Sequence, residues 1–366
     1  MNLARKNIQM LSAYIAGKPI EETKRELGLS DVIKLASNEN PLGPSPKAVS
    51  AMRKALVSVH RYPDSNNFYL KQKLSKMYGL APDHFVLGNG SDELIDIVIK
   101  TFVNEDENIV TSQWTFLEYE IIARVNNRQV LTAPLKNFTY DLAALREKVN
   151  AKTKLVFIAN PNNPTGTYVS KDAFDAFVSG LPETVIVVLD EAYDTFIDVK
   201  DYPHGSDYVG KQNVLVLKTF SKAYGLSGLR VGYCVGEPRF CAFMEKTRQP
   251  FNINSLAQAG ALAALDDKAF LRTTRSVVLA GKKYLYKQLA ALELAYVPSV
   301  ANFILVDVGR DCVEVFRELL KRGVIVRDMK QYGLGNFIRV TIGTLSENRR
   351  FIAALGQVLE KTRKTT

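Results

Sequence analysis

The stretch LVLKTFSKAYGLSGLRVGY (residues 215–233) joins two apolar runs through small and polar residues, and Lys222 comes shortly after the first run. Apolar runs without alternation are typical of strands that are buried on both faces of a parallel sheet. A lysine is an unusual residue at the crowded end of such a strand, because its ammonium group loses hydration there. We therefore take Lys222 as the first candidate for a chemical role.

Similar short runs recur between residues 80 and 235, and they end in Gly, Pro, Asn, Asp or Ser. They include HFVLGNG, ENIVTS, RQVLTAP, TKLVFIANP, TVIVVLDEAY and LRVGYCVG. Stretches with helical spacing of apolar residues, such as 91–102, 140–149 and 170–180, lie between them. This alternation predicts an α/β fold in which helices cover both faces of a mainly parallel sheet. Ligands of such sheets bind beyond the carboxyl ends of the strands.

The C-terminal part of the chain has a different order of predicted helices and strands. Residues 268–293 predict a long connecting helix, and NFILVDVG, GVIVRDM and NFIRVTIG predict strands with a helix at 312–322 and another from about Ser346. We expect three parts: an N-terminal arm over residues 1–35 that joins the small domain, a large domain over 36–267, and a small α+β domain over 268–366.

The composition of the 366-residue chain is that of an ordinary globular protein, with 46% hydrophobic and 23% charged residues. The three cysteines form no CxxC pair and the three histidines lack metal-ligand spacing, so we expect reduced thiols, a cytoplasmic location and no metal site. The net charge of +10 is interspersed with acidic residues, which favours solvated helix faces over a nucleic-acid interface. No apolar run approaches the length of a membrane span.

Four of the predicted strands end in polar residues that would meet at one edge of the sheet. These ends are Gly88–Glu93, Asn160–Gly166, Asp190–Tyr193 and Thr219–Lys222. Each has an ordinary explanation alone: Ser91 could be a helix N-cap, Asn163 a turn residue and Asp190 a cap or a surface ion-pair partner. Because all four follow buried runs, their convergence favours a ligand site.

The chemistry of these strand ends suits one cofactor. A Gly-rich turn into a helix binds phosphate through its N–H groups and positive dipole end. A buried carboxylate can keep a ring nitrogen protonated, and an amide and a phenol can bind a ring oxygen. A lysine amine can form a Schiff base with an aldehyde. Phosphate, pyridinium, phenolate and aldehyde together describe pyridoxal phosphate (PLP).

The chain resembles the PLP-dependent aminotransferases of fold type I, and among them most closely the histidinol-phosphate aminotransferases. The motifs that carry the resemblance are LASNENPLGPSP, HRYPD, GNGSDE, ANPNNPTG, DEAY, TFSKAYGLSGLRVGY and IRVTIG, in the family's order from residue 35 to 343. The resemblance implies a large domain with a mainly parallel seven-stranded sheet and a smaller α+β domain.

The resemblance also implies a role for each motif residue. Lys222 is implied as the Schiff-base lysine and proton carrier, and Asp190 as the partner of the ring nitrogen. Tyr193 and Asn163 match the residues that bond the ring oxygen. Tyr62 of HRYPD corresponds to a tyrosine that reaches the phosphate of the neighbouring subunit's cofactor, which implies a homodimer. The residues implied for the phosphate cup are Gly90, Ser91, Asp92, Thr219, Ser221 and Arg230.

One motif departs from the family's pattern. Where the family commonly has a proline-rich PPT before an aromatic residue, this chain has SQWTF at residues 112–116. By register, Phe116 is expected to stack on the pyridine ring. Trp114 competes with it, but for Trp114 we favour core packing. Lys218 replaces Lys222 as the covalent lysine only if the register is wrong.

Substrate contacts are expected from Tyr14, Asn38, Arg327 and Arg339. Arg339 stands in IRVTIG, where the family has its substrate-anion arginine, and Arg327 follows GVIV in the same lobe. Two guanidinium groups suit a phosphate, and one can also bind the carboxylate of glutamate. For Arg327 the alternative is a surface position at a strand end. Asn38 is expected to hold the arm near the cofactor, unless its motif is only a turn.

The reaction implied is amino transfer from L-glutamate to imidazole-acetol phosphate, which gives L-histidinol phosphate and 2-oxoglutarate in histidine biosynthesis. The mechanism would be ping-pong through pyridoxamine phosphate. The alternatives are an aromatic-amino-acid aminotransferase, a decarboxylase of the kind that acts on threonine phosphate, and a non-enzymatic sensor domain of a regulator. Because no DNA-binding segment flanks the motifs in this sequence, we expect an enzyme.

Overall fold

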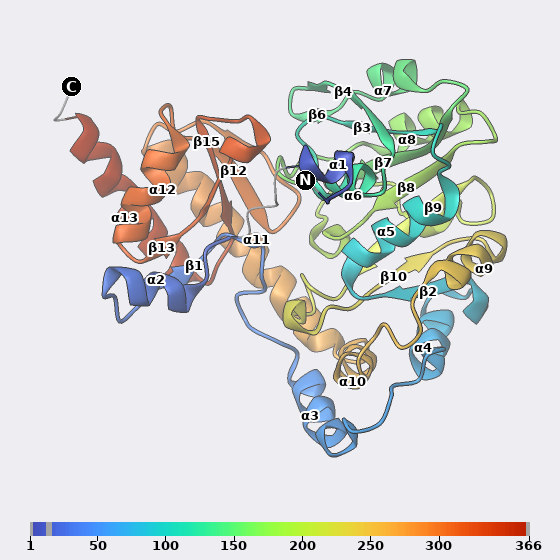
Figure 1. Ribbon diagram of the computed structural model, residues 1–366. Coiled ribbons are helices and arrows are strands. Elements are labelled where there is room, and N and C mark those ends of the chain that lie inside the picture. The colour runs from blue at the N-terminus through green and yellow to red at the C-terminus, as the bar shows by residue number, and fades with distance from the viewer. Residues whose placement is uncertain (1–2, 12–16, 364–366) are drawn as a thin grey trace.

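The computed structural model describes residues 3–11 and 17–363. Two lobes lie side by side, and the long helix α11 (Lys268–Ala291) runs between them (Figure 1). No helix within the described ranges is long and apolar enough to span a membrane.

A seven-stranded sheet forms the centre of the large lobe. Its order is β2 (Phe85–Gly88), β10 (Gly232–Val235), β9 (Val214–Thr219), β8 (Ile186–Asp190), β7 (Thr153–Ala159), β3 (Asn108–Ser112) and β4 (Gln129–Ala133). Only β10 runs antiparallel to its neighbours, and the other adjacent pairs are parallel. The connection from β9 to β10 contains no α-helix, and parallel pairing needs a long crossover, usually helical. The predicted mainly parallel α/β sheet is therefore confirmed.

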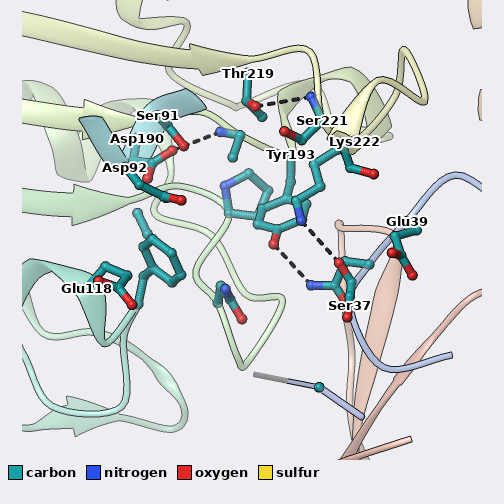
Figure 2. A pocket seen from close by; sticks show the side chains of 18 of the residues that line it. Ser37, Glu39, Ser91, Asp92, Glu118, Asp190, Tyr193, Thr219, Ser221 and Lys222 are labelled. Atoms are coloured by element: carbon teal, nitrogen blue, oxygen red, sulfur yellow. Dashed lines mark hydrogen bonds between the residues drawn. The ribbon is translucent and has the colours of Figure 1, made fainter. Parts of the chain in front are cut away.

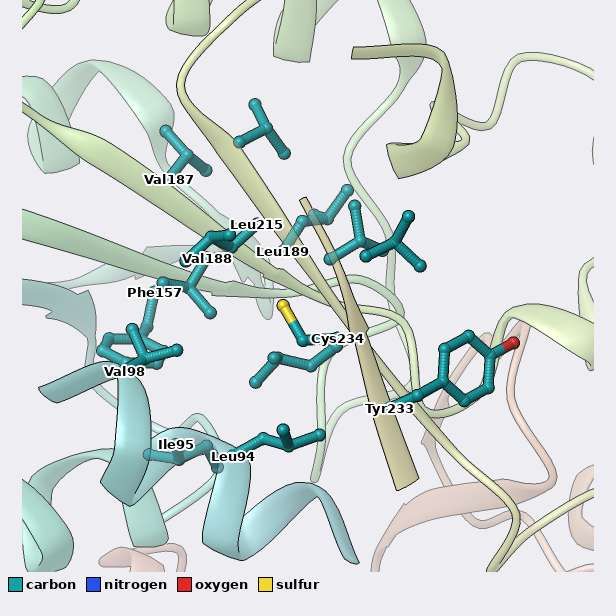
Figure 3. Close-up of a cluster of buried hydrophobic side chains, with 14 of the residues drawn as sticks. Leu94, Ile95, Val98, Phe157, Val187, Val188, Leu189, Leu215, Tyr233 and Cys234 are labelled. Atoms are coloured by element: carbon teal, nitrogen blue, oxygen red, sulfur yellow. The ribbon is translucent and has the colours of Figure 1, made fainter. Parts of the chain in front are cut away.

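Helices cover this sheet and bury its apolar side chains. They are α5 (Gly90–Phe102), α6 (Glu118–Val125), α7 (Leu142–Lys148), α8 (Lys171–Ser179) and α9 (Pro238–Thr247). Leu94 and Val98 of α5 share a buried cluster with Phe157 of β7 and Val188 of β8 (Figure 3), and all four side chains are fully buried. The remaining elements of this lobe are α3 (Pro46–Ala55), α4 (Phe68–Tyr78), α10 (Ser255–Ala264), β5 (Leu135–Lys136), β6 (Thr139–Tyr140) and the short 3-10 helices η1 (Leu56–Ser58), η2 (Pro82–His84), η3 (Asp194–Phe196), η4 (Gly205–Tyr208) and η5 (Ser227–Leu229).

The small lobe has its own sheet and its own core. Its antiparallel sheet has the order β11 (Tyr296–Val297), β12 (Phe303–Asp307), β15 (Phe337–Thr341) and β14 (Arg327–Asp328). The helices α12 (Cys312–Lys321) and α13 (Leu345–Arg363) pack with it, and η6 (Lys330–Tyr332) precedes β15. The predicted α+β character of this region is confirmed.

The N-terminal segment contacts both lobes. The side chains of Arg5 and Asn7, at α1 (Lys6–Gln9), donate hydrogen bonds to backbone carbonyls of Arg124 and Val125 at α6 in the large lobe. Farther along, α2 (Ile20–Leu27) is followed by β1 (Ile33–Lys34), which pairs in parallel with β13 (Val324–Ile325) of the small lobe. The domain boundaries after residues 35 and 267 stay a prediction.

Candidate active site

A cavity of about 260 Å³ lies between the lobes at the carboxyl ends of β7, β8 and β9. This size suits a small molecule, and the position is where parallel sheets bind ligands. The predicted site residues that line it are Asn38, Ser91, Asp92, Phe116, Asn163, Asp190, Tyr193, Thr219, Ser221, Lys222, Arg230, Arg327 and Arg339. Gly90 adjoins this set, Tyr62 does not line the cavity, and Tyr14 lies outside the described residues.

Lys222 presents its amine to this cavity. Its Nζ donates a hydrogen bond of 3.1 Å to the backbone oxygen of Ser37 and lies 5.7 Å from the ring centre of Tyr193 (Figure 2). Lys218, the alternative that depends on register, does not line the cavity and pairs with two carboxylates instead. The geometry therefore favours Lys222 as the reactive amine.

Asp190 is a buried carboxylate at the end of β8. Its Oδ2 accepts a hydrogen bond of 2.7 Å from the hydroxyl of Tyr119, and its Oδ1 accepts one of 3.0 Å from the N–H of Ala192. Burial raises the pKa of Asp190 to about 6, and the Tyr119 hydrogen bond opposes this shift only in part. No ion pair within the described ranges involves Asp190. A buried acid of this kind suits a ligand that brings its own positive charge.

A hydrogen-bond network fixes the polar wall opposite the sheet. Asn38 Nδ2 donates to Tyr193 Oη at 3.0 Å, and the N–H of Asn38 donates to Thr341 Oγ1 at 2.9 Å. Asn38 has a φ of 55°, a left-handed conformation that Asn tolerates better than most residues. Asn163 Oδ1 accepts a hydrogen bond from Arg339. Asn38 thus links the N-terminal segment to Tyr193.

The start of α5 forms an anion-binding corner. Gly90 has a φ of 81°, a conformation that favours glycine, and a Cβ there would lie 2.5 Å from Arg230 Nη2, so a side chain would displace that guanidinium. Arg230 donates to Asp92 Oδ2 at 2.9 Å and to Ser221 Oγ at 3.4 Å. Ser91 is not the helix N-cap, since the helix begins at Gly90 and Ser91 instead faces the cavity. Backbone N–H groups at a helix start and a guanidinium together suit phosphate.

Two arginines of the small lobe enter the same cavity. Arg327 of β14 and Arg339 of β15 are cross-strand partners, and each is only 7% exposed. Arg327 donates to Gln331 Oε1 at 3.2 Å and Arg339 to the backbone oxygen of Ala36 at 2.8 Å. Arg339 Nε is buried and has no hydrogen-bond partner among the described residues. Like charges across a strand pair repel each other, which an anionic ligand relieves. The surface alternative for Arg327 is therefore wrong.

The two aromatic residues of the SQWTF segment, Trp114 and Phe116, lie in different environments. Phe116 lines the cavity and makes an edge-to-face contact with Tyr119, with ring centres 5.6 Å apart. Trp114 is 37% exposed, does not line the cavity, and stacks on Phe138. Core packing was the wrong expectation for Trp114. Its φ of 50° turns the chain, and the side chain of Asn162 binds the Trp114 carbonyl at 3.0 Å.

Several lining residues were missed in the sequence analysis, among them Tyr119, Glu118 and Ser37. Tyr119 lies in the first turn of α6, and Phe116 precedes that helix; their rings meet edge to face. Glu118 lines the wall near Asp92, and burial raises its pKa, with the Asp92 charge adding to the shift. Ser37 contributes a backbone oxygen, for which no sequence signal exists.

The chain is similar to known aminotransferases over nearly its full length. The family model "Aminotransferase class I and II" matches residues 30–355. The histidinol-phosphate aminotransferase of Moorella thermoacetica is 48% identical over 97% of this chain and 92% of its own length. Histidinol-phosphate aminotransferase 2 of Carboxydothermus hydrogenoformans is 45% identical over 98% and 99%. The crystal structure of histidinol-phosphate aminotransferase from Sinorhizobium meliloti in complex with pyridoxal-5′-phosphate superposes with a TM-score of 0.91, at 29% identity over 99% of both chains.

The burial of Asp190 predicts a measurable pH effect on the ligand-free protein. Because its pKa rises from 3.8 to about 6 on folding, ionised Asp190 costs the folded state about 3 kcal/mol above pH 6, and nothing below pH 4. Asp190→Asn should therefore raise the melting temperature of ligand-free protein at pH 8. The gain should shrink as the pH falls through 6. Thermal unfolding between pH 5 and 8 measures it, and a wild type as stable as the variant at pH 8 would contradict the prediction.

Proposed function

This chain belongs to the aminotransferase class I and II family, and we propose that it transfers the amino group of L-glutamate to imidazole-acetol phosphate. The products are L-histidinol phosphate and 2-oxoglutarate, by a ping-pong mechanism in L-histidine biosynthesis. The observation that carries this specificity is the buried pair Arg327 and Arg339, which faces the same cavity as Lys222. Relatives 43–48% identical, named as histidinol-phosphate aminotransferases, support it.

We infer that the cavity holds pyridoxal phosphate, because its residues match each part of that molecule. The α5 corner with Arg230 suits the phosphate, and Asp190 suits the ring nitrogen. Tyr193 and Asn163 suit the ring oxygen, and Phe116 offers a face for stacking. When bound, the cofactor supplies an aldehyde that bonds amino groups and a ring that withdraws electrons from the substrate's Cα.

The protein's own groups then have distinct tasks. The Lys222 amine anchors the cofactor at rest and carries the proton that leaves the substrate's Cα. Asp190 stays ionised beside the cationic ring nitrogen, because that charge offsets the burial that otherwise favours its neutral form. Tyr193 is oriented for its contact by Asn38.

Arg327 and Arg339 orient the substrate by its anionic groups. A planar guanidinium binds phosphate or carboxylate through two parallel hydrogen bonds, and burial strengthens both. We propose that both arginines bind the phosphate of histidinol phosphate and that Arg339 alone binds glutamate by a carboxylate. One cavity then serves both half-reactions.

We further propose that the active unit is a homodimer. Tyr62 is 84% exposed and stacks on Phe251, with ring centres 4.8 Å apart. Several apolar side chains in the same stretch of chain are also exposed; they are Leu56, Val57, Val59, Phe68 and Tyr69. Exposed apolar side chains in such number favour burial against a partner. A second copy would cover them and bring Tyr62 to the neighbouring phosphate site.

Three expectations from the sequence remain proposals beside this one. They are the cytoplasmic location, the absence of a nucleic-acid partner and the domain boundaries. The aromatic-amino-acid aminotransferase is the main alternative activity, since it shares the cofactor contacts. A decarboxylase of O-phosphorylated amino acids is a less favoured alternative, which carbon dioxide release without amino transfer would reveal.

Steady-state kinetics test the proposed reaction. With 2-oxoglutarate as acceptor, we expect kcat/KM for histidinol phosphate to exceed that for phenylalanine by at least ~100-fold. The reason is that only histidinol phosphate has a phosphate group to bind both arginines. The measurement is glutamate formation with each donor. A higher kcat/KM for phenylalanine would transfer the assignment to the aromatic alternative.

Arg327→Gln should separate the two half-reactions. Loss of one buried guanidinium–phosphate contact should lower kcat/KM for histidinol phosphate about 100-fold, whereas the glutamate half-reaction should change by no more than about threefold. Single-turnover absorbance changes with each substrate measure both effects. Equal losses in the two half-reactions would show that Arg327 has no phosphate-specific role.

Mixed dimers test the donated tyrosine. Tyr62→Ala should weaken cofactor binding about tenfold through loss of one hydrogen bond to a charged group, and Lys222→Ala should remove turnover. The assay uses a PLP concentration near the wild-type Kd, at which Tyr62→Ala is mostly unloaded. When the two variants are unfolded and refolded together in equal amounts, half of the dimers carry one intact site. Intact sites are then a quarter of all sites, and activity should rise to about a quarter of the wild-type value. If the mixture is no more active than its components, Tyr62 does not act across the interface.

A further inference from the structure

A buried ionic cluster lies behind the cavity wall and has no part in the chemistry described above. Lys218 of β9 places its Nζ 2.6 Å from Glu191 Oε2 and 2.5 Å from Asp194 Oδ2. The side chains of Lys218 and Glu191 are 10% and 0% exposed, and that of Asp194 is 25% exposed. We name these three residues the Lys218 cluster. None of them lines the cavity.

The cluster is joined directly to two residues of the site. Glu191 follows Asp190 in the chain, and Asp194 follows Tyr193. The N–H of Asp194 donates to the Glu191 carbonyl at 3.2 Å, which makes residues 191–194 a turn. Lys218 therefore contacts both ends of this turn, Glu191 and Asp194. The residues that precede those ends, Asp190 and Tyr193, line the cavity.

The rest of the surroundings keeps this cation charged and in place. Burial opposes the charge on Lys218, but Asp194 and Glu191 more than offset it and raise its pKa well above the ordinary value. Glu191 Oε1 also accepts a hydrogen bond of 2.7 Å from the N–H of Gly205. On the neighbouring strand, Tyr233 is the cross-strand partner of Lys218, and its hydroxyl lies 2.9 Å from that of Tyr78.

Stability is a poor reason for such a cluster. Buried ion pairs are often replaceable by apolar residues without loss of stability, because burial costs about as much as the attraction returns. What a buried pair supplies is a defined geometry, since each charge has only one low-energy position.

We propose that Lys218 is a positioning residue for the cofactor site: by bridging Glu191 and Asp194 it fixes the turn that presents Asp190 and Tyr193 to the cavity. The inference rests on the proposed PLP site, since it assigns Lys218 to the presentation of two cofactor contacts. The role of Lys218 is distinct from that of Lys222, although the two are only four residues apart.

The test compares cofactor affinity with fold stability in four variants. Lys218→Met removes the bridge, Lys218→Arg keeps its charge, and Asp194→Asn removes one anchor while leaving a balanced Lys218–Glu191 pair. The control is Lys71→Met, which breaks a partly buried pair of 2.7 Å with Glu245 outside the cavity. For each, PLP is titrated into cofactor-free protein, and absorbance gives the Kd and the spectrum of the bound cofactor. Thermal unfolding of the cofactor-free form gives the melting temperature.

We expect Lys218→Met to weaken PLP binding at least tenfold and to alter the bound-cofactor spectrum, as removal of an orienting partner commonly does. Asp194→Asn should weaken binding about threefold, and Lys218→Arg should stay within about twofold of the wild type. Lys71→Met should lower the melting temperature without changing the Kd.

The proposal is overturned if Lys218→Met and Asp194→Asn keep the wild-type Kd and spectrum, whatever their melting temperatures. If Lys218→Met yields no folded protein, Asp194→Asn decides alone, because its cluster keeps a neutral charge balance. Failure of the wild type itself to bind PLP would overturn the proposed function rather than the role of Lys218.

Discussion

The site depends first on one buried charge, the carboxylate of Asp190 at the end of β8. Two hydrogen bonds, from Tyr119 and from the N–H of Ala192, replace only part of the hydration that this group loses. Burial therefore raises the pKa of Asp190 to about 6 in the protein alone. A ligand with a cationic ring nitrogen, such as the proposed cofactor, would offset this cost of burial.

The second constraint is the joining of two lobes around that carboxylate. The large lobe supplies Lys222, Asp190 and the anion-binding corner at the start of α5, whereas the small lobe supplies Arg327 and Arg339. The repulsion between these two guanidiniums is tolerated because each also binds an oxygen of the protein, and because the cavity they share admits an anion. In the proposed function, the substrate's anionic group and the cofactor would be held by different lobes, so the distance between the lobes would set the distance between the two ligands.

The polar residues at most of the strand ends could be predicted to lie together. Each motif follows a buried apolar run, and parallel strands end at a common edge of the sheet. The sequence alone is therefore enough to expect Asp190, Lys222 and Asn163 together. Ser91 was open to a capping role that the structure rejects, since the helix starts one residue earlier. Trp114 was misjudged because its exposure depends on a left-handed backbone conformation that the local sequence does not signal. The contact of Tyr119 with Asp190 could not be read from the sequence, because the two residues are 71 positions apart.

The sequence by itself determined the order of strands and helices, the residues at the strand ends and the resemblance to a family of PLP enzymes. These follow from hydrophobic periodicity and from motifs that are short and local. Only the tertiary structure decided which lysine faces the cavity, that Lys218 is bound between two carboxylates, and that Arg327 lies buried beside Arg339. Such facts depend on burial and on contacts between residues far apart in the chain, and the free energy of a charge changes with those surroundings far more than with its neighbours in sequence.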